Sequence, residues 1–187
     1  MAVDTNIVSV LAHGVERSHC SHCMASTLRP LHCPSCSTAV FCSDSCRTAA
    51  LDTHHKYECK LALADLNTLQ MSKSDNSQSC SSIQLLIRFF TQKTRKYFAE
   101  HQGMFEQIIA CNIDDSANVY SSQDYSRLLA LVSHPKRDLL GQTWQICLAL
   151  FVLKCLSYCG WLQEELSFKT PLTNEHLYLV ALCVQMR

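Results

Sequence analysis

Cys20-Ser-His-Cys23 opens a run of four close pairs of metal-ligand residues, and this run decides the fold. The other three pairs are Cys33-Pro-Ser-Cys36, Cys42-Ser-Asp-Ser-Cys46 and His55-Lys-Tyr-Glu-Cys59. Zinc prefers four soft or borderline ligands in a tetrahedron, and two nearby residues on one tight turn readily supply half of such a site. The sequence therefore predicts a module that holds two zinc ions.

Disulfides and simple buried cysteines are the alternative interpretations of these residues. The chain has 13 cysteines, an odd number, and Met1–Val10 lack the basic start and the cleavage site of a signal peptide. We therefore expect a reducing compartment, the cytoplasm, the nucleus or both, where disulfides are rare. His54 competes with His55 for the histidine position, although the three residues between His55 and Cys59 fit the motif better.

The order of the pairs, ending in His-x-x-x-Cys, resembles a MYND zinc finger. The resemblance implies an interleaved arrangement in which pairs one and three share one zinc and pairs two and four share the other. Carried over to this sequence, the first site is Cys20, Cys23, Cys42 and Cys46, and the second is Cys33, Cys36, His55 and Cys59. Because both shells are filled by protein ligands, we expect structural zincs with no open position for water.

Few apolar residues are available to form a core inside this module. The candidates are Leu28, Leu31, Val40, Phe41, Leu51 and Tyr57. This number is too small to offset the entropy lost on ordering the segment. Metal binding must therefore supply most of the folding free energy. The free energy of zinc binding in zinc-finger peptides is about 10–16 kcal/mol.

Helical patterns follow the finger, after a polar linker at Met71–Ser79. Helices are expected at 82–100, 123–133, 143–159 and 174–187, the last one capped by Thr173. The first carries an apolar stripe that includes Ile83, Leu86, Ile87 and Phe90, with Arg88 expected on its solvated face. The third is shorter than the roughly 20 residues needed to cross a bilayer, so we expect a core helix and no membrane partner.

The predicted fold class is thus a small zinc-stabilised irregular and α module followed by an all-α helical region. The expected divisions are a lead-in at 1–19, the finger at 20–59, a helix end and polar linker at 60–81, and the helical region at 82–187. Six cysteines outside the finger are expected to be small buried apolar residues, as free cysteine usually is. They are Cys80, Cys111, Cys147, Cys155, Cys159 and Cys183.

A broader resemblance links the finger, the serine-rich linker and segments such as Ile83-Gln-Leu-Leu-Ile-Arg88 to the SET-and-MYND lysine methyltransferases. In that family, the finger and a helical insert interrupt a split SET domain. The family binds S-adenosylmethionine through a glycine-containing turn and an Asn-His-Ser-Cys sequence. This chain has four glycines, none within two residues of another, and no asparagine followed by histidine. We therefore expect a fragment-like chain without catalytic or cofactor-binding residues, in which S-adenosylmethionine would serve only a full-length parent.

Three functional classes follow. The favoured one is a zinc-dependent protein-interaction module, and the first alternative is a lysine methyltransferase when the protein is full length. A nucleic-acid-binding zinc protein is the weakest, because the net charge is zero and the finger spacing differs from that of base-reading fingers. The resemblance implies proline-rich peptides and chromatin-associated proteins as partners, but Leu51 occupies the place of the family's peptide-stacking tryptophan, so peptide binding should be weakened.

Overall fold

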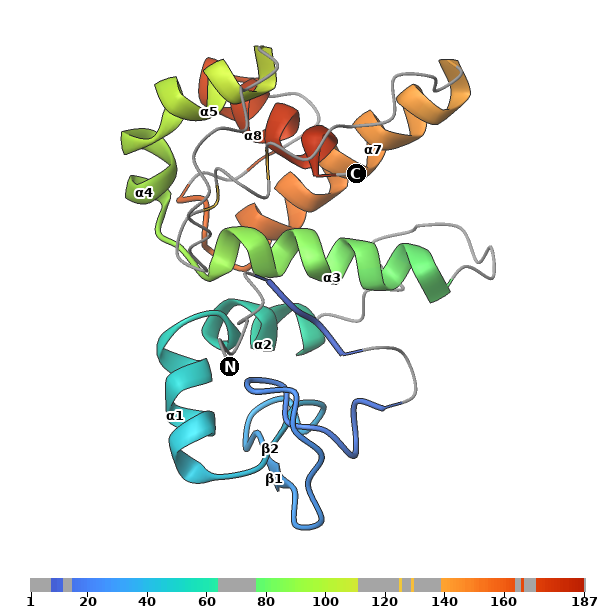
Figure 1. The fold of residues 1–187 in the computed structure, drawn as a ribbon, viewed down its shortest axis with the longest axis vertical. Coiled ribbons are helices and arrows are strands. Elements are labelled where there is room, and N and C mark those ends of the chain that lie inside the picture. The colour runs from blue at the N-terminus through green and yellow to red at the C-terminus, as the bar shows by residue number, and fades with distance from the viewer. Residues whose placement is uncertain are drawn as a thin grey trace, which may run out of the picture. The chain divides into compact units, whose positions relative to one another are not determined.

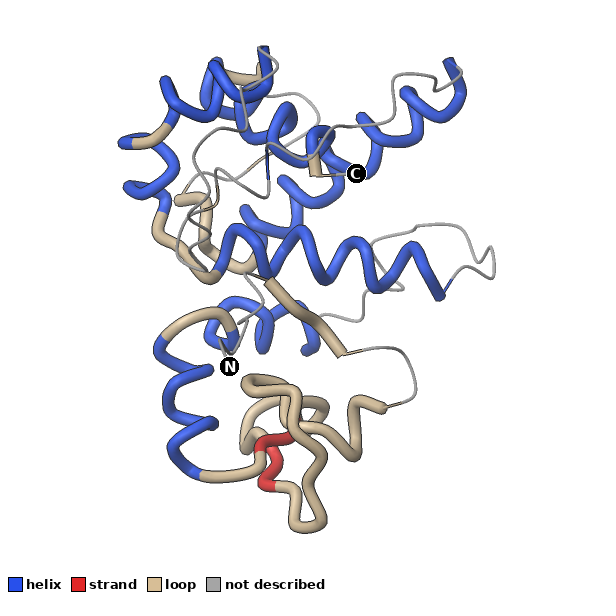
Figure 2. The backbone as a smooth tube through the Cα atoms, viewed as in Figure 1, coloured by secondary structure: helices blue, strands red, loops and turns tan. Residues whose placement is uncertain are grey.

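The computed structural model of the chain describes residues 8–11, 15–63, 77–110, 125, 129, 139–163, 166 and 171–186. Its elements in chain order are β1 (Leu31–His32), β2 (Val40–Phe41), α1 (Asp44–Asp52), α2 (His55–Leu63), α3 (Ser77–Thr91), α4 (Arg95–Glu100), α5 (Gln102–Ala110), α7 (Leu139–Tyr158) and α8 (Asn174–Gln185) (Figure 1). The two strands lie inside the zinc module, and the described elements after it are helices (Figure 2). The expected fold class is confirmed.

The chain divides into two compact units. The finger unit comprises Val8–Thr94 together with Cys155–Glu165, and the helical unit comprises Met1–Ile7, Arg95–Lys154 and Leu166–Arg187. The end of α7 and the residues that follow it thus belong to the finger unit, although they are distant from the finger in sequence. The domain boundaries inferred from the sequence stay a prediction.

A short hairpin and two helices build the zinc module. β1 and β2 pair antiparallel, with Leu31 opposite Phe41 and His32 opposite Val40. α1 begins after Ser43, whose hydroxyl accepts a hydrogen bond from the Cys46 backbone N–H at 3.2 Å. Serine is a preferred cap at this position because its side chain satisfies a backbone donor that the first helical turn leaves unpaired. The Ser43 cap therefore also fixes the position of the Cys46 backbone.

The prediction of a single helix at 82–100 is wrong, because the helix is interrupted between α3 and α4. α3 ends at Thr91 and α4 begins at Arg95. The backbone carbonyl of Lys93, in the break, accepts a hydrogen bond from the Trp161 indole N–H at 3.1 Å, and the Trp161 ring packs on Phe90 at a centroid distance of 5.6 Å. A tertiary contact with a residue far along the chain thus overrides the local helical pattern.

Two other expectations concern the ends of elements. α3 begins at Ser77, so the last residues of the expected linker at Met71–Ser79 are helical, and the rest of that linker lies outside the described residues. The helix expected at 123–133 also lies outside them, except for Tyr125 and Leu129, which are buried.

α7 is longer than its apolar pattern suggested. It begins at Leu139 and runs for 20 residues, so the length argument against a membrane span does not hold. By length and composition alone it could cross a bilayer, and among the described helices it is the one that could. Leu148, Val152 and Leu153 are buried, whereas Leu139 and Leu140 at its start are exposed. Only the later part of α7 therefore has the core character expected of the whole helix.

The end of α7 is held by a Schellman motif. Gly160 has φ 83°, a left-handed conformation that glycine adopts without the penalty that other residues incur. The Trp161 N–H bonds to the Leu156 carbonyl at 2.9 Å and the Gly160 N–H to the Ser157 carbonyl at 3.0 Å. Lys60 of α2 adds a bond from its ammonium to the Cys159 carbonyl at 3.1 Å. The Lys60 bond joins the end of α7 to α2 within the finger unit.

The cysteines outside the finger are only partly as expected. Cys155, Cys159 and Cys183 are buried. Cys147 is exposed, because it lies on a side of α7 that faces solvent, as the exposed Ile146 and Leu150 do. Cys80 and Cys111 lie among the residues whose side chains the structure does not describe.

α8 agrees with its predicted start. Thr173 caps it in a capping box with His176, and the Tyr178 hydroxyl donates to the Phe98 carbonyl at 3.1 Å. The core of the helical unit includes Phe98, Phe105, Tyr125, Leu129, Tyr178 and Leu182.

Acid should weaken the helical unit through Glu175. Arg95 forms two hydrogen bonds of 2.6 Å with this carboxylate, and they lower the pKa of Glu175. A carboxylate with a lowered pKa contributes stability above its unfolded pKa and loses it as pH falls through the folded value. In thermal unfolding, Glu175→Gln should lower Tm at pH 7, and the gap to the parent should close as pH falls below the ordinary glutamate pKa of about 4.3.

Glu100→Gln is the matched control, since Glu100 forms a longer and more exposed ion pair with Lys96, at 3.5 Å. It should leave Tm nearly unchanged at every pH. A constant gap between the parent and Glu175→Gln from pH 7 to pH 3 would contradict the linkage.

Candidate metal centre

The first ligand group brings together Cys20, Cys23, Cys42 and Cys46. Its ligand atoms all lie within 4.8 Å of one another. The Cys42 sulfur is 3.6 Å from the Cys23 sulfur and 3.6 Å from the Cys46 sulfur. The group combines two cysteines on a turn before β1, one directly after β2 and one in the first turn of α1, so residues from three local structures meet at one point.

The second ligand group brings together Cys33, Cys36, His55 and Cys59. The sulfurs of Cys33 and Cys59 are 3.9 Å apart, and the Cys36 sulfur is 3.7 Å from Nε2 of His55. Cys33 and Cys36 lie on the turn after β1, and His55 and Cys59 lie on successive turns of α2. All eight residues singled out in the sequence are therefore placed in the two expected groups.

These distances fit zinc. A tetrahedron with zinc–sulfur bonds of about 2.3 Å has sulfur–sulfur edges of about 3.8 Å. The observed sulfur–sulfur separations of 3.6, 3.6 and 3.9 Å lie close to that edge. They are far longer than a disulfide bond of about 2.05 Å, and every cysteine whose side chain the structure describes is free. The finger thus contains two zinc-binding groups, each supplying a full set of four protein ligands.

His55, not His54, belongs to the second group. His54 is not a member of that group, and its ring stacks on the His22 ring with centroids 5.7 Å apart. Burial lowers the pKa of His54 to about 2, so this ring is neutral. The His22 side chain in this stack is half-buried. Burial also lowers the pKa of His55, which keeps it in the neutral form that binds metal.

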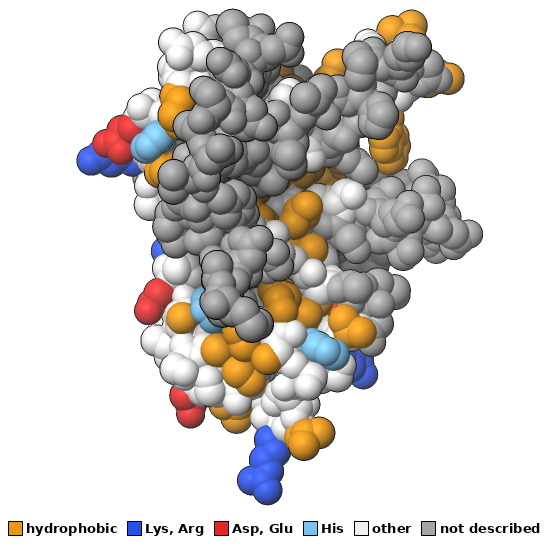
Figure 3. All heavy atoms as spheres, in the orientation of Figure 1, with side chains coloured by type: hydrophobic (Ala, Val, Ile, Leu, Met, Phe, Trp, Pro, Cys, Tyr) orange, Lys and Arg blue, Asp and Glu red, His pale blue; other side chains and the backbone are white. Residues whose placement is uncertain are grey.

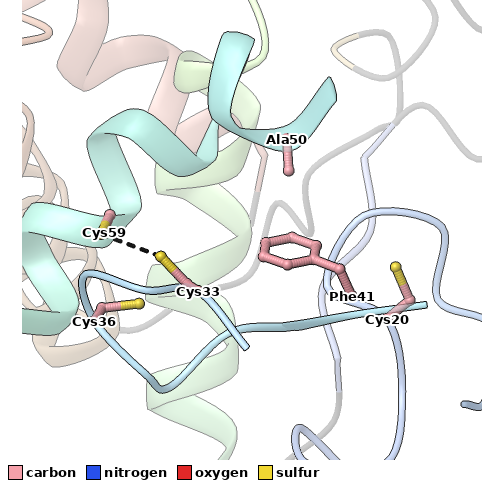
Figure 4. Close-up of a cluster of buried hydrophobic side chains, with 6 residues drawn as sticks. All are labelled: Cys20, Cys33, Cys36, Phe41, Ala50 and Cys59. Atoms are coloured by element: carbon pink, nitrogen blue, oxygen red, sulfur yellow. Dashed lines mark hydrogen bonds between the residues drawn. The ribbon is translucent and has the colours of Figure 1, made fainter. Parts of the chain in front are cut away.

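A small core separates and supports the two groups. Figure 4 shows Cys33, Cys36 and Cys59 close together, with the Phe41 ring between them and Cys20 in this view. The Phe41 and His55 rings form a T-shaped pair with centroids 5.5 Å apart. Because Phe41 directly precedes the ligand Cys42, the hairpin positions both a metal ligand and the main apolar side chain of the module.

Without metal, the clustered thiols differ in how readily they ionise. Burial and the neighbouring sulfurs raise the pKa of Cys23 and of Cys59 to about 12 each. Burial also acts to raise the pKa of Cys20, but the backbone N–H groups of Cys23, Cys42 and His22 outweigh it and lower that pKa to about 7. Zinc binds the thiolate form, so binding must release protons, and affinity should rise with pH.

Arg88 is a site residue that sequence reasoning placed wrongly. It is buried, and its guanidinium forms a bidentate pair with Glu58 at 2.5 and 2.7 Å. The same side chain donates to the carbonyls of Ser9 and Ser21 at 3.2 and 3.1 Å. Glu58 lies between His55 and Cys59, and Ser21 lies between Cys20 and Cys23. One arginine of α3 therefore holds a ligand-bearing segment of each zinc group.

No local signal could have identified this role. In the sequence, Arg88 is one of several basic residues near the polar side of an amphipathic helix, and Glu58 is an ordinary helical glutamate. Their pairing requires α2 and α3 to pack against each other, as Figure 1 shows.

Comparisons with known proteins agree with this geometry. Residues 20–59 match the family described as MYND finger. A segment of 58 residues is 41% identical to "Protein-lysine N-methyltransferase SMYD4" from Danio rerio. It covers 31% of this chain and 8% of that protein, so the likeness concerns a small part of the relative. No solved structure matches the chain.

Proposed function

We propose that the chain, whose residues 20–59 form a zinc-binding MYND finger, is the protein-interaction part of a SET-and-MYND type lysine methyltransferase. One observation carries the proposal: each metal group has four protein ligand atoms within 4.8 Å of one another. A zinc ion held by four protein ligands keeps no position for water or substrate and acts structurally. The finger can then act on a partner only through its surface, which fits the protein-interaction role of MYND modules.

The surface of the finger suits contact with a peptide better than contact with a nucleic acid. Figure 3 shows hydrophobic side chains beside histidines over the finger on the viewed face, with charged side chains scattered rather than clustered. The net charge of zero supplies no general attraction to phosphates. Proteins or proline-rich peptides are therefore the partner class that we propose, with chromatin-associated proteins as one example. The location that we propose for the chain is the cytoplasm, the nucleus or both.

Leu51 sets the expected strength of peptide binding. It lies on α1 and is half-buried, at the place where the resemblance implies a tryptophan that stacks on proline rings. A leucine offers no flat aromatic face for such stacking. In calorimetry, a Pro-x-Leu-x-Pro peptide should bind the parent only weakly, and Leu51→Trp should tighten binding by about tenfold, from about 1.4 kcal/mol of added contact.

Leu28→Trp is the matched control, because it adds the same side chain at a fully exposed position of the finger. It should not change the affinity. Micromolar binding by the parent that is lost in Leu51→Ala would contradict the expectation, because it would show that leucine itself forms the binding surface.

A second candidate is the methyltransferase activity of a longer protein. It is favoured by the 41% identity to a protein-lysine N-methyltransferase over the finger segment. The chain itself lacks the Asn-His-Ser-Cys sequence that the resemblance associates with S-adenosylmethionine. Saturable binding of S-adenosylmethionine to the zinc-loaded chain would place this candidate first.

A further inference from the structure

The two zinc groups differ in their exposure to solvent. All four ligands of the second group are buried. In the first group only Cys20 is buried, whereas Cys42 and Cys46 are half-buried and Cys23 is exposed. Zinc binds cysteine in the thiolate form, so in the loaded finger the exposure of each sulfur decides its oxidation, and a dissolved oxidant reaches the first group more readily than the second.

The sulfurs also differ in how the backbone shields them. Three backbone N–H groups face the Cys20 sulfur, and the Cys36 sulfur accepts a hydrogen bond from the Thr38 hydroxyl at 3.2 Å. One backbone N–H, that of Ala25, faces the Cys23 sulfur. Hydrogen bonds to a thiolate withdraw electron density and make it a weaker nucleophile. Cys23 is therefore the most exposed of the ligand cysteines, and it has fewer backbone donors than Cys20.

A second thiolate stands close enough to complete a disulfide. The sulfurs of Cys23 and Cys42 are 3.6 Å apart, so a small side-chain movement brings them to bonding distance. The Cys42 sulfur is also 3.6 Å from the sulfur of Cys46, the ligand of this group that lies on α1. An oxidised Cys23 thus has a resolving partner within its own zinc group.

We propose that Cys23 is a peroxide-reactive residue and that its oxidation releases zinc from the first group only. The Cys23 thiolate attacks one peroxide oxygen, the oxygen–oxygen bond breaks, and the departing hydroxide takes a proton to give water. The Cys42 thiolate then attacks the sulfur of the Cys23 sulfenic acid, and a second hydroxide leaves and is protonated. Two thiolates have lost two electrons to the peroxide, and zinc dissociates after losing two of its four ligands.

The consequence reaches the surface of the finger. Cys46 joins the first turn of α1 to the first group, and the same helix carries Leu51. Loss of this zinc frees the start of α1 while the second group still holds α2 through His55 and Cys59. Zinc release from the first group can be measured without a bound peptide.

The test uses the zinc-loaded full chain carrying Cys147→Ser, which removes the exposed free thiol of α7. Peroxide is added, released zinc is followed with a chromogenic chelator, and disulfides are mapped by mass spectrometry. One zinc per chain should leave about tenfold faster than the other, because susceptibility follows exposure. The first disulfide should join Cys23 to Cys42. Equal release rates, or first oxidation at Cys33, Cys36 or Cys59, would overturn the proposal.

A variant gives an independent check. Cys23→His keeps a zinc ligand and removes the reactive sulfur, so the fast phase should vanish while two zincs remain bound before peroxide is added. If this variant binds only one zinc, the mapping of the first disulfide in the parent still decides between the two groups.

Discussion

Replacing Cys33 with serine is expected to abolish zinc binding at the second group and to unfold at least the part of the finger that this group holds. Cys33 is buried beside Cys36 and Cys59, and serine supplies no thiolate. Structural zinc contributes about 10–16 kcal/mol in finger peptides, as much as the whole stability of many domains, about 5–15 kcal/mol. The small core around Phe41 cannot replace that contribution.

Elemental mass spectrometry and far-ultraviolet circular dichroism would measure this effect. The parent should contain two zincs per chain, and Cys33→Ser should contain one or none and lose helical signal from α2. Cys46→Ser should instead disturb the first group and leave the second metallated, at least in part. Cys147→Ser, an exposed cysteine outside both groups, is the control and should keep two zincs. A parent with one zinc, or with iron, would contradict the two-group arrangement.

Removing the Arg88 side chain is expected to have the next largest effect. Arg88 and Glu58 are 9% and 19% exposed, so breaking the pair leaves a largely buried carboxylate without its partner. Removing one member of a buried ion pair costs about 3–5 kcal/mol. The carbonyls of Ser9 and Ser21 lose donors as well. Arg88→Met should therefore lower the free energy of unfolding by roughly that amount and speed zinc loss from both groups.

Urea unfolding of the zinc-loaded chain would measure the loss. Arg47→Met is the matched control, because it breaks the exposed pair with Asp44 on α1 and should cost at most about 1 kcal/mol. Adding Glu58→Gln to Arg88→Met should restore part of the stability, since the unpaired charge is then gone. Equal stability of Arg88→Met and Arg47→Met would show that the buried pair does not hold the finger to α3.

The zinc groups could be predicted because their chemistry is local. Each half-site is a pair of ligands on one turn, so residue type and spacing carry the signal without reference to the rest of the fold. Which pairs share a zinc could not be predicted from local spacing. That pairing came from the resemblance to MYND fingers. The structure places Cys20 with Cys46 and Cys33 with Cys59 in that interleaved way.

The helices show where local patterns stop being sufficient. The capping residue Thr173 marked the start of α8 correctly, because a cap acts within one turn. The break between α3 and α4 was missed, because it depends on Trp161 taking the Lys93 carbonyl from across the chain. The early start of α7 at Leu139 was missed too. Leu139 and Leu140 are exposed, so the start of the helix does not continue the buried apolar pattern from which the helix was predicted.

The sequence by itself determined the two-zinc module, its eight ligands and the helical character of the rest, because these follow from ligand spacing and helical periodicity. Only the tertiary structure decided that Arg88 is buried against Glu58, that Cys147 is exposed, and that the first zinc group is open while the second is closed. Burial depends on which surfaces meet after folding. Residues of the same type and spacing, such as the two cysteine pairs Cys20/Cys23 and Cys33/Cys36, therefore end in different environments.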